Sequence, residues 1–568
     1  MKPFIEFKDV TFQYHSQSAP TLHNITVTIN HGEKILVVGP SGSGKSTFAH
    51  CINGLIPHIY QGSLRGTVTV NGKDVSQSNL SELSFEVGTV LQDTDGQFIG
   101  LTVAEDVAFS LENECVEQAE IIKKVGKLTT EVGLETHLFK RPQELSGGQK
   151  QRVSMAGVLI DEVPLLLLDE PLANLDPATG QESMALIDQM CQEQDRTVVI
   201  VEHRLEDVLY RKVDRILVFE EGTIIADLTP EALLKSAVLN EVGIREPLYV
   251  SAMKYAGVNL QETTGIASVA TVASPDLLSQ LNTWESQTEK PELPECSEEL
   301  LELRELNYKY PSTEETVLAG LSVTFNRGEM LSIVGKNGAG KSTLCKAICG
   351  FIKPQSGSLL WQGRDFTELS IKERADHVGF VMQNPNQMIS QKMIVDEVGL
   401  GLVLRGVPQE EVATRVKEVL HICGLYPFRN WPISALSFGQ KKRVTIAAIL
   451  VLEPAMILLD EPTAGQDLRH YTEMMVFLEK LSQQGIAIAM VTHDMHLMLE
   501  YTTRALVIGE GRILADTTPA KVLTNPALIA KASLKETSLF TFAKKIGMEN
   551  PVSFTEKFIA YEREVRLG

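Results

Sequence analysis

The stretch Gly39–Thr47 reads GPSGSGKST, and the stretch Gly335–Thr343 reads GKNGAGKST. Each follows a short apolar run and fits the pattern GxxxxGK[ST], in which glycines let backbone N–H groups turn toward a phosphate. The helix expected after each loop adds its positive dipole end. The predicted phosphate-binding residues are Gly39, Pro40, Ser41, Gly42, Ser43, Gly44, Lys45, Ser46, Thr47, Gly335, Lys336, Asn337, Gly338, Ala339, Gly340, Lys341, Ser342 and Thr343.

Both loops belong to a larger repeat. LSGGQKQR at 145–152 is matched by LSFGQKKR at 436–443, and LLLLDEP at 165–171 by MILLDEP at 456–462. In both copies the serine of the first motif lies 23 residues before the aspartate of the second. Motifs duplicated in one order at matched spacings indicate two copies of one nucleotide-hydrolysing domain.

Acidic residues follow a buried apolar strand in each copy. Asp169 and Asp460 end these strands, where a carboxylate can hold a Mg²⁺ shell, and Ser46 and Ser342 of the loops are predicted to ligate the same ion. The residues directly after the aspartates, Glu170 and Glu461, can orient an attacking water. The alternative is a solvated acidic pair at a strand end.

A histidine follows the next buried strand in each copy. His203 lies 34 residues after its aspartate, and His493 lies 33 residues after its own. A histidine in this place can link the γ-phosphate to the attacking water, whereas a lone histidine is more often structural. Its recurrence favours the catalytic interpretation.

Composition and charge limit the possible functions. The 568 residues include 43% apolar residues and carry a formal net charge of -21, which argues against a general nucleic-acid binder. The seven cysteines form no CxxC motif, so free thiols in a reducing cytoplasm are expected. Cys345 and Cys349 are one helical turn apart, but no cluster of further ligands supports a metal site there. Without an apolar run of about 18 residues, we expect a chain that is soluble by itself and, at most, peripheral on a membrane.

The repeat also predicts the domain organisation. We expect an α/β chain with two tandem nucleotide-binding domains, each a mixed β-sheet core with a helical subdomain. The domains are predicted at 1–235 and 299–520. An acidic linker with some short structure is predicted at 236–298, and a helical C-terminal extension at 521–568.

Taken together, LSGGQ and its partner motifs resemble the signature of the ATP-binding cassette (ABC) ATPases, which are P-loop NTPases. In that family two domains pack head to tail, and each ATP lies between the loop of one domain and the signature of the other. The resemblance implies intramolecular pairing of the two domains here, with ATP and Mg²⁺ as cofactors. It places Ser437, Gly439 and Gln440 at the Lys45 site, and Ser146, Gly148 and Gln149 at the Lys341 site.

The same resemblance implies roles for further residues. Tyr14 and Tyr310 match the aromatic that stacks on adenine, with ordinary strand packing as the alternative. The resemblance adds Gln92 and Gln383 to the Mg²⁺ ligands, and it matches Asp176 and Asp467 to the loop that couples the two sites. One departure is Phe438 in place of the first signature glycine. Its ring can crowd the phosphate of the Lys45 site or point away, so two competent but unequal sites are predicted.

Sequences after the two glutamines are similar to those of energy-coupling factor (ECF) transporter ATPases. This similarity implies a peripheral protein on the cytoplasmic face of the cell membrane, with a membrane-embedded T component and a substrate-binding S component that captures a vitamin or metal ion. Phe98 and Met388 would line an apolar groove for helices of the T component, or else belong to the core. The alternative function is a soluble tandem ATPase acting on the ribosome or nucleic acid. Nucleic acid is not expected as a partner, because the linker is acidic and no zinc module is present.

Overall fold

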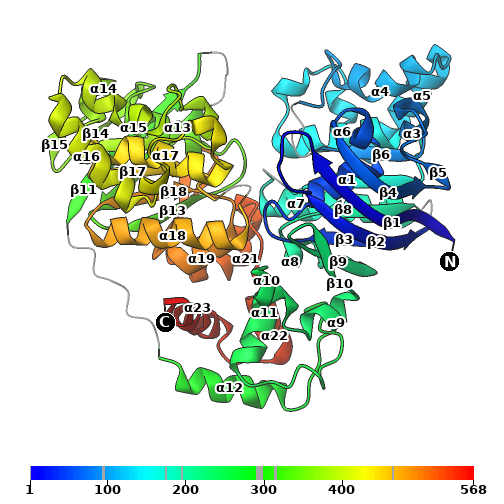
Figure 1. Ribbon diagram of the computed structural model, residues 1–568. Helices are drawn as coiled ribbons and strands as arrows, with labels where there is room; N and C mark the ends of the chain where they lie inside the picture. The colour runs from blue at the N-terminus through cyan, green and yellow to red at the C-terminus, as the bar shows by residue number, and fades with distance from the viewer. Residues whose placement is uncertain are drawn as a thin grey trace. The chain divides into compact units, whose positions relative to one another are not determined.

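The computed structural model (Figure 1) describes residues 2–91, 96–172, 175–192, 196–289, 298–311, 316–463 and 466–567. The chain divides into two compact units, Met1–Thr283 and Trp284–Gly568. Each unit has a four-stranded antiparallel sheet and a six-stranded mixed sheet with helices around them. The predicted α/β class with two tandem domains is therefore confirmed.

The antiparallel sheet of unit 1 has the strand order β2-β1-β4-β5. The long first strand buries alternate residues, Ile5 and Phe7 before a register shift and Val10 and Phe12 after it, as expected for a sheet with one face on the core. The strands are β1 (Pro3–Tyr14), β2 (Leu22–Asn30), β4 (Gly62–Val70) and β5 (Lys73–Asp74).

The mixed sheet of unit 1 has the order β10-β9-β3-β8-β7-β6, and only β10 runs antiparallel to its neighbour. Strands β3 and β8 are buried at every position, because helices or the second sheet cover both faces. The strands are β3 (Lys34–Val38), β6 (Val87–Val90), β7 (Leu165–Asp169), β8 (Thr197–Val201), β9 (Arg215–Glu220) and β10 (Thr223–Leu228).

Helix α1 joins the two sheets of unit 1 into one core. Its Phe48 stacks on Phe7 of β1 with ring centroids 4.5 Å apart and meets Phe219 of β9 at 5.2 Å. The helices are α1 (Lys45–Ile52), α2 (Leu55–His58), α3 (Leu80–Ser84), α4 (Val103–Asn113), α5 (Gln118–Glu131), α6 (Gly147–Leu159), α7 (Pro177–Gln192), α8 (Leu205–Val208), α9 (Pro230–Leu234), α10 (Val238–Val242), α11 (Leu248–Tyr255) and α12 (Leu277–Gln287), the last of which crosses the unit boundary.

Unit 2 repeats this plan. Its sheets have the orders β12-β11-β14-β15 and β16-β17-β18-β13-β19-β20. The strands are β11 (Glu299–Lys309), β12 (Thr316–Asn326), β13 (Met330–Val334), β14 (Ser356–Trp361), β15 (Arg364–Asp365), β16 (Val378–Val381), β17 (Met456–Asp460), β18 (Ala487–Val491), β19 (Arg504–Gly509) and β20 (Arg512–Thr517).

The helices of unit 2 follow the same order as far as α19. Helices α15, α16 and α17 share one apolar cluster with strands β16 and β17, which forms the predicted helical subdomain. The helices are α13 (Lys341–Cys349), α14 (Ile371–Arg374), α15 (Ile394–Leu404), α16 (Gln409–Ile422), α17 (Phe438–Leu450), α18 (Leu468–Gln483), α19 (Met495–Tyr501), α20 (Pro519–Leu523), α21 (Pro526–Ala532), α22 (Ser538–Ile546) and α23 (Pro551–Leu567).

The duplication extends beyond the nucleotide-binding domains. Helix α11 has a counterpart in α22, 290 residues later, and equivalent residues bracket both helices. A positive-φ residue lies before each helix and a positive-φ glycine after it, and a lysine near the end of each helix pairs with a glutamate before it. The matched pairs are Gly243 and Ser533, Glu246 and Glu536, Lys254 and Lys544, and Gly257 and Gly547.

The described part of residues 236–298, the segment predicted to form a linker, is therefore packed more extensively than the prediction implied. Tyr249, Val250 and Met253 of α11 are buried, and the Tyr249 hydroxyl donates to the Ile266 carbonyl at 2.6 Å. Leu248 N–H donates to Glu206 of α8 at 3.1 Å, which ties the segment to the helix after His203. Ser- and Thr-rich stretches hid this packing, although buried apolar residues run through the segment from Leu239 to Trp284. The predicted domain boundaries stay predictions.

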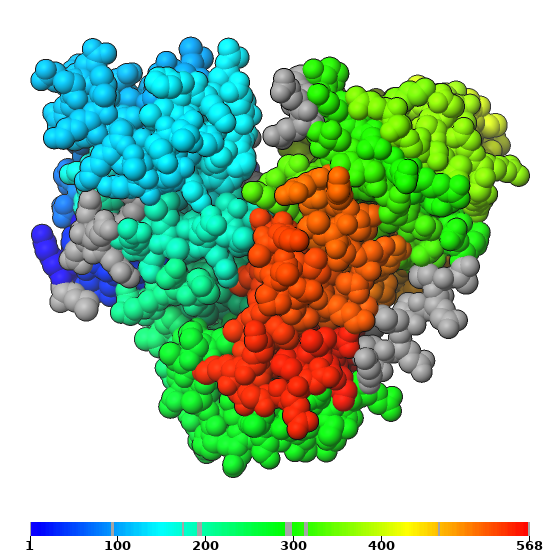
Figure 2. Space-filling view, turned by 180° about the vertical axis from the view of Figure 1, so that it is seen from behind, coloured from blue at the N-terminus to red at the C-terminus, as the bar shows by residue number. Residues whose placement is uncertain are grey.

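Helix α23 ends the chain and packs within unit 2. Trp284 meets Phe554 and Tyr561 of this helix at centroid distances of 5.7 Å and 5.5 Å. Arg563 donates to the carbonyls of Glu500 and Thr502 at the end of α19. Figure 2 shows this C-terminal segment (red) directly against the orange segment that precedes it. The extension thus covers the helix that begins just after His493.

No helix in the described ranges combines the length and the apolar character needed to cross a membrane. Five cysteines are free thiols, and among them Cys115 is exposed and the others are buried: Cys51, Cys115, Cys345, Cys349 and Cys423.

Replacing Trp284 by Ala should loosen α23. Truncation of a buried tryptophan costs about 3–5 kcal/mol, and Trp284 is only 7% exposed. We expect amide hydrogen exchange within 551–567 to accelerate by about 100-fold or more. Trp431→Ala is the matched control, because that ring is 47% exposed. Unchanged exchange in α23 of the Trp284→Ala variant would contradict this account of the packing.

Candidate functional site: two nucleotide sites

The loop Gly39–Thr47 connects β3 to α1, as predicted. Lys45 is 5% exposed, and its ammonium donates to the carbonyls of Gly39 and Pro40 at 2.8 Å and 2.7 Å, which holds it over the loop. Gly44 is the N-cap of α1 at φ +100°, and no side chain caps the helix there. The first amides of α1 therefore remain available to an anion that enters the loop.

The second loop has the same geometry. Lys341 donates to the carbonyls of Gly335 and Lys336 at 2.6 Å and 3.0 Å. Gly340, at φ +104°, begins α13 without a side-chain cap. A Cβ atom added to Gly340 would lie 2.7 Å from the Val317 carbonyl oxygen, so only glycine fits this close approach.

The glutamates after the two strand-end aspartates have a strained backbone. Glu170 has φ +50° and Glu461 has φ +45°, values that non-glycine residues rarely adopt. Their N–H groups donate to the carbonyls of Val201 and Val491, each at 2.9 Å, which fixes the turn after the strand. Backbone strain of this kind is common at functional residues, although other duplicated turns of this chain, such as those at Glu162 and Glu453, share it.

Each glutamate faces the histidine of its own unit. His203 Nε2 lies 3.1 Å from Glu170 Oε1, and His493 Nε2 lies 3.7 Å from Glu461 Oε1. The shorter distance permits a hydrogen bond and the longer one does not. Burial opposes ionisation of Glu170, but the hydrogen bond and charge of His203, with Lys45 and Arg204, lower its pKa below the ordinary value.

The pKa values of the strand-end aspartates are shifted in the opposite direction, upward. Burial and the neighbouring Glu170 raise the pKa of Asp169 to about 6, despite the charge of Lys45. Burial likewise raises the pKa of Asp460, although the Lys442 and Lys341 charges and a hydrogen bond from Ser342 oppose the shift. Asp169 Oδ1 is buried and has no hydrogen-bond partner in the described chain. A cation would satisfy that oxygen.

The two predicted adenine-stacking residues lie beside the loops. The Tyr14 hydroxyl is 3.2 Å from Thr47 Oγ1, and the Tyr310 hydroxyl is 3.3 Å from Thr343 Oγ1. Tyr14 also meets Phe12 edge-on at 4.8 Å. Both rings thus lie next to the phosphate loop while packing on their own strand.

The predicted signature residues begin α6 and α17. Ser146 and Ser437 are the N-caps, and each forms a capping box with the glutamine three residues later. These glutamines are Gln149 and Gln440. Phe438 is 42% exposed on the first turn of α17. The signature serines and glutamines thus form two preorganised helix N-termini.

The two predicted coupling aspartates also begin helices. Asp176 accepts a hydrogen bond from Thr179 N–H at 3.0 Å at the start of α7, and Asp467 accepts one from His470 N–H at 2.9 Å at the start of α18. Both carboxylates are nearly buried. Each carboxylate caps a helix of its own unit, and this role explains its burial without any contact to the other unit.

Only one of the two glutamines predicted to ligate Mg²⁺ lies among the described residues. Gln92 lies outside the described residues, whereas Gln383 follows the edge strand β16 and has an exposed side chain. Phe98 is half-buried, and Met388 packs against the apolar cluster of the helical subdomain.

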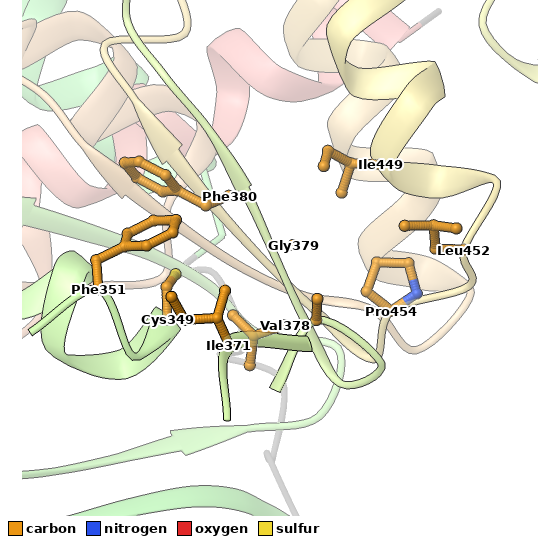
Figure 3. Close-up of a pocket in the computed structure, with 10 residues that line it drawn as sticks. Cys349, Phe351, Ile371, Val378, Gly379, Phe380, Ile449, Leu452 and Pro454 are labelled. Atoms are coloured by element: carbon orange, nitrogen blue, oxygen red, sulfur yellow. The ribbon is translucent and has the colours of Figure 1, made fainter. Parts of the chain in front are cut away.

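An apolar pocket of about 140 Å³ lies at β16 (Figure 3). It is lined by Cys349, Phe351, Ile371, Ala375, Val378, Gly379, Phe380, Ile449, Leu452 and Pro454. In Figure 3 the rings of Phe351 and Phe380 lie on one side of the strand, and Ile449, Leu452 and Pro454 on the other. Neither Phe98 nor Met388 lines this pocket.

Sequence reasoning missed two buried charges. Glu202 is 3% exposed and accepts from the N–H groups of His203 at 2.9 Å and Leu172 at 3.2 Å. Burial raises its pKa. Lys442 is 1% exposed beneath the second site. Unit 2 has Thr492 in place of Glu202, and unit 1 has Gln151 in place of Lys442, so comparison of the two copies could have found both.

Comparison with known proteins agrees with this geometry. The chain matches the model of the ABC transporter family at residues 22–173 and 318–464. Residues 236–308 match a model described as an ATP-binding cassette cobalt transporter.

Curated relatives extend the match over the whole chain. A putative ABC transporter ATP-binding protein of Enterococcus faecalis is 64% identical over 567 residues, which is 100% of both chains. One of Streptococcus mutans is 54% identical over 98% of this chain and 99% of its own. A solved structure of cbiO1 from Clostridium perfringens, described as part of the ABC transporter complex cbiONQ, is 34% identical, with a TM-score of 0.39, over 41% of this chain and 94% of that one.

The chain therefore belongs to the family of ABC transporter ATP-binding proteins. Proteins of this class bind and hydrolyse ATP and couple the hydrolysis to transport, and this chain carries two of their nucleotide-binding domains.

Two neighbouring glycines of the first loop provide a matched pair. Both Gly42 and Gly44 have positive φ, so alanine at either costs about 1–2 kcal/mol of strain. A Cβ atom at Gly44 would also lie 2.9 Å from Leu22 Cδ2 and 3.0 Å from the Thr21 carbonyl, whereas nothing lies within 4 Å at Gly42. We expect Gly44→Ala to abolish ATP binding at one of the two sites in calorimetry, and Gly42→Ala to weaken it less. Equal affinities of the two variants would be inconsistent with this geometry.

Proposed function

We propose that this chain is the ATP-hydrolysing, energy-coupling subunit of an ECF-type importer. In this role it drives uptake of a vitamin, a related small nutrient or a metal ion through a membrane-embedded T component and a substrate-binding S component. The observation that carries the proposal is the joining of two duplicated ATP sites with a region, 236–308, that matches a cobalt-transporter model.

In the proposed reaction each unit's own loop binds the phosphates of ATP. The amides of Gly39–Thr47 and the Lys45 ammonium bind the β- and γ-phosphates of one ATP, and Gly335–Thr343 with Lys341 bind those of the other. Glu170 and Glu461 then orient and polarise the attacking water. The 3.1 Å contact between Glu170 and His203 supports this assignment, because it keeps the carboxylate ionised and aligned.

Mg²⁺ fits the residues at the strand ends. The buried, unsatisfied Asp169 Oδ1 and its raised pKa indicate an anion that lacks sufficient counter-charge. When bound there, the ion neutralises charge on the phosphate oxygens. The proposed ligands are Ser46, Gln92 and Asp169 in unit 1, and Ser342, Gln383 and Asp460 in unit 2.

We further propose that the two domains pair head to tail within the chain. ATP at Lys45 then meets Ser437, Gly439 and Gln440, and ATP at Lys341 meets Ser146, Gly148 and Gln149. The N-terminal turns of α6 and α17, which begin at these serines, support this role because a helix N-terminus favours an anion.

The proposed location is peripheral, at the cytoplasmic face of the cell membrane. The apolar pocket at β16 supports contact with an apolar helix of the T component, because it lies on the strand that leads into Gln383. The net charge of -21 argues against nucleic acid as the partner.

The test of this function is a detergent pull-down of the tagged chain from its native membrane, with mass spectrometry of the partners. We expect a polytopic T-like protein and a small, very apolar S-like protein, and the S protein would identify the substrate. Recovery of ribosomal proteins without any membrane partner would overturn the importer assignment.

The catalytic assignment has its own test. Glu170→Gln combined with Glu461→Gln should lower ATP turnover by at least about 1000-fold, because neither site retains its carboxylate, while ATP binding persists. Glu162→Gln with Glu453→Gln is the matched control, since these equivalent glutamates also have positive φ but lie in the turns between α6 and β7 and between α17 and β17. Turnover at the control level in the first double variant would refute the assignment.

A further inference from the structure

A buried lysine lies beneath the second ATP site. Lys442 belongs to α17 and is 1% exposed. Its Nζ donates to the carbonyls of Met382 at 2.9 Å and Gln383 at 2.7 Å, and it lies 3.3 Å from the carbonyls of Asp460 and Glu461. An ammonium has three N–H donors, so two serve the Gln383 segment and the third is shared at the end of β17.

The charge of Lys442 is costly to bury. Burial lowers its pKa to about 8, although the charges of Asp460 and Glu461 act in the opposite direction. A methionine would fill a similar volume without this desolvation penalty. The benefit of an ammonium in this place must therefore come from the backbone carbonyls that it joins.

In unit 1 the equivalent buried position carries an uncharged residue. Gln151, the equivalent residue of α6, is 3% exposed and donates to the Pro171 carbonyl. Its Oε1 accepts from Ser183 of α7 at 3.2 Å. In unit 2 the position of Ser183 is occupied by Met474, which is buried in the apolar cluster and cannot pair with an amide in the same way. The lysine and the methionine thus replace the glutamine and the serine together.

We propose that Lys442 is a positioning residue of the Lys341 site. Its ammonium clamps the Gln383 segment to the end of β17, so that Gln383 and the Asp460–Glu461 pair hold a fixed mutual geometry. In unit 1 the equivalent position carries the neutral Gln151, and the two sites therefore differ in their chemistry independently of Phe438. This inference rests on the proposed assignment of Gln383, Asp460 and Glu461 to the second ATP site.

The effect of Lys442 is best measured one site at a time. Glu170→Gln leaves hydrolysis to the Lys341 site, and Glu461→Gln leaves it to the Lys45 site. In the Glu170→Gln background, we expect Lys442→Gln to lower kcat about 10-fold or more, with KM for ATP changed less than 2-fold and the Mg²⁺ concentration for half-maximal rate raised. In the Glu461→Gln background, Lys442→Gln should change kcat less than 2-fold.

Two further variants separate positioning from stability. Lys442→Arg retains the cation and should keep kcat within about 3-fold of the Glu170→Gln parent, whereas Lys442→Met fills the volume without donors and should behave as Lys442→Gln does. Lys441→Gln, with the same loss of charge one residue away, should leave kcat unchanged.

The outcomes are distinguishable. Unimpaired turnover with Lys442→Met in the Glu170→Gln background, equal losses in both backgrounds, or a loss that Lys442→Arg does not rescue would each overturn the positioning role. If Glu461→Gln combined with Glu170→Gln left turnover intact, the site assignment itself would be at fault, whatever the Lys442 variants did.

Discussion

Both ATP sites depend on the burial of charge at the carboxyl end of a parallel sheet. Carboxylates placed there are rigid, but they are also desolvated, and each must find a counter-charge or a hydrogen bond. Lys45 and His203 provide part of that compensation in unit 1, yet the pKa of Asp169 is still raised to about 6. A site that is incompletely neutralised in this way is suited to a cation. The loop also holds Lys45 where its charge lowers the pKa values of Asp169 and Glu170.

The two units meet this constraint with different residues. Unit 1 adds a buried acid, Glu202, whose oxygens accept the N–H groups around His203. Unit 2 has the neutral Thr492 there and adds the buried base Lys442. Each unit therefore has a different set of buried charged residues around its equivalent aspartate, glutamate and histidine. The distance between the histidine Nε2 and the glutamate Oε1 also differs between the units, at 3.1 Å in unit 1 and 3.7 Å in unit 2.

Much of the fold and of both sites could be predicted, because loops, strand ends and helix N-termini have local sequence signals. GxxxxGK[ST], the apolar run before Asp169 and the serine N-cap of α6 each specify a backbone shape within a few residues. The buried charges were missed because a lysine or glutamate in a helix or after a strand usually faces solvent, and only tertiary contacts bury it. The helix pair α11 and α22 was missed for a different reason, since the first copy lies in a Ser- and Thr-rich region and the second is separated from it by 290 residues.

The positive φ of Glu170 and Glu461 costs the chain stability at positions where activity is expected to need the side chain. Each residue holds a left-handed conformation that glycine or asparagine adopts at lower cost, so replacing either glutamate by glycine would relieve about 1 kcal/mol of strain while removing the carboxylate. A screen that rewards thermal stability alone would therefore favour loss of the proposed catalytic acids. Thermostabilised versions of this chain need a selection for ATP turnover in parallel, because the conformations that hold the proposed water-orienting groups are among the strained ones.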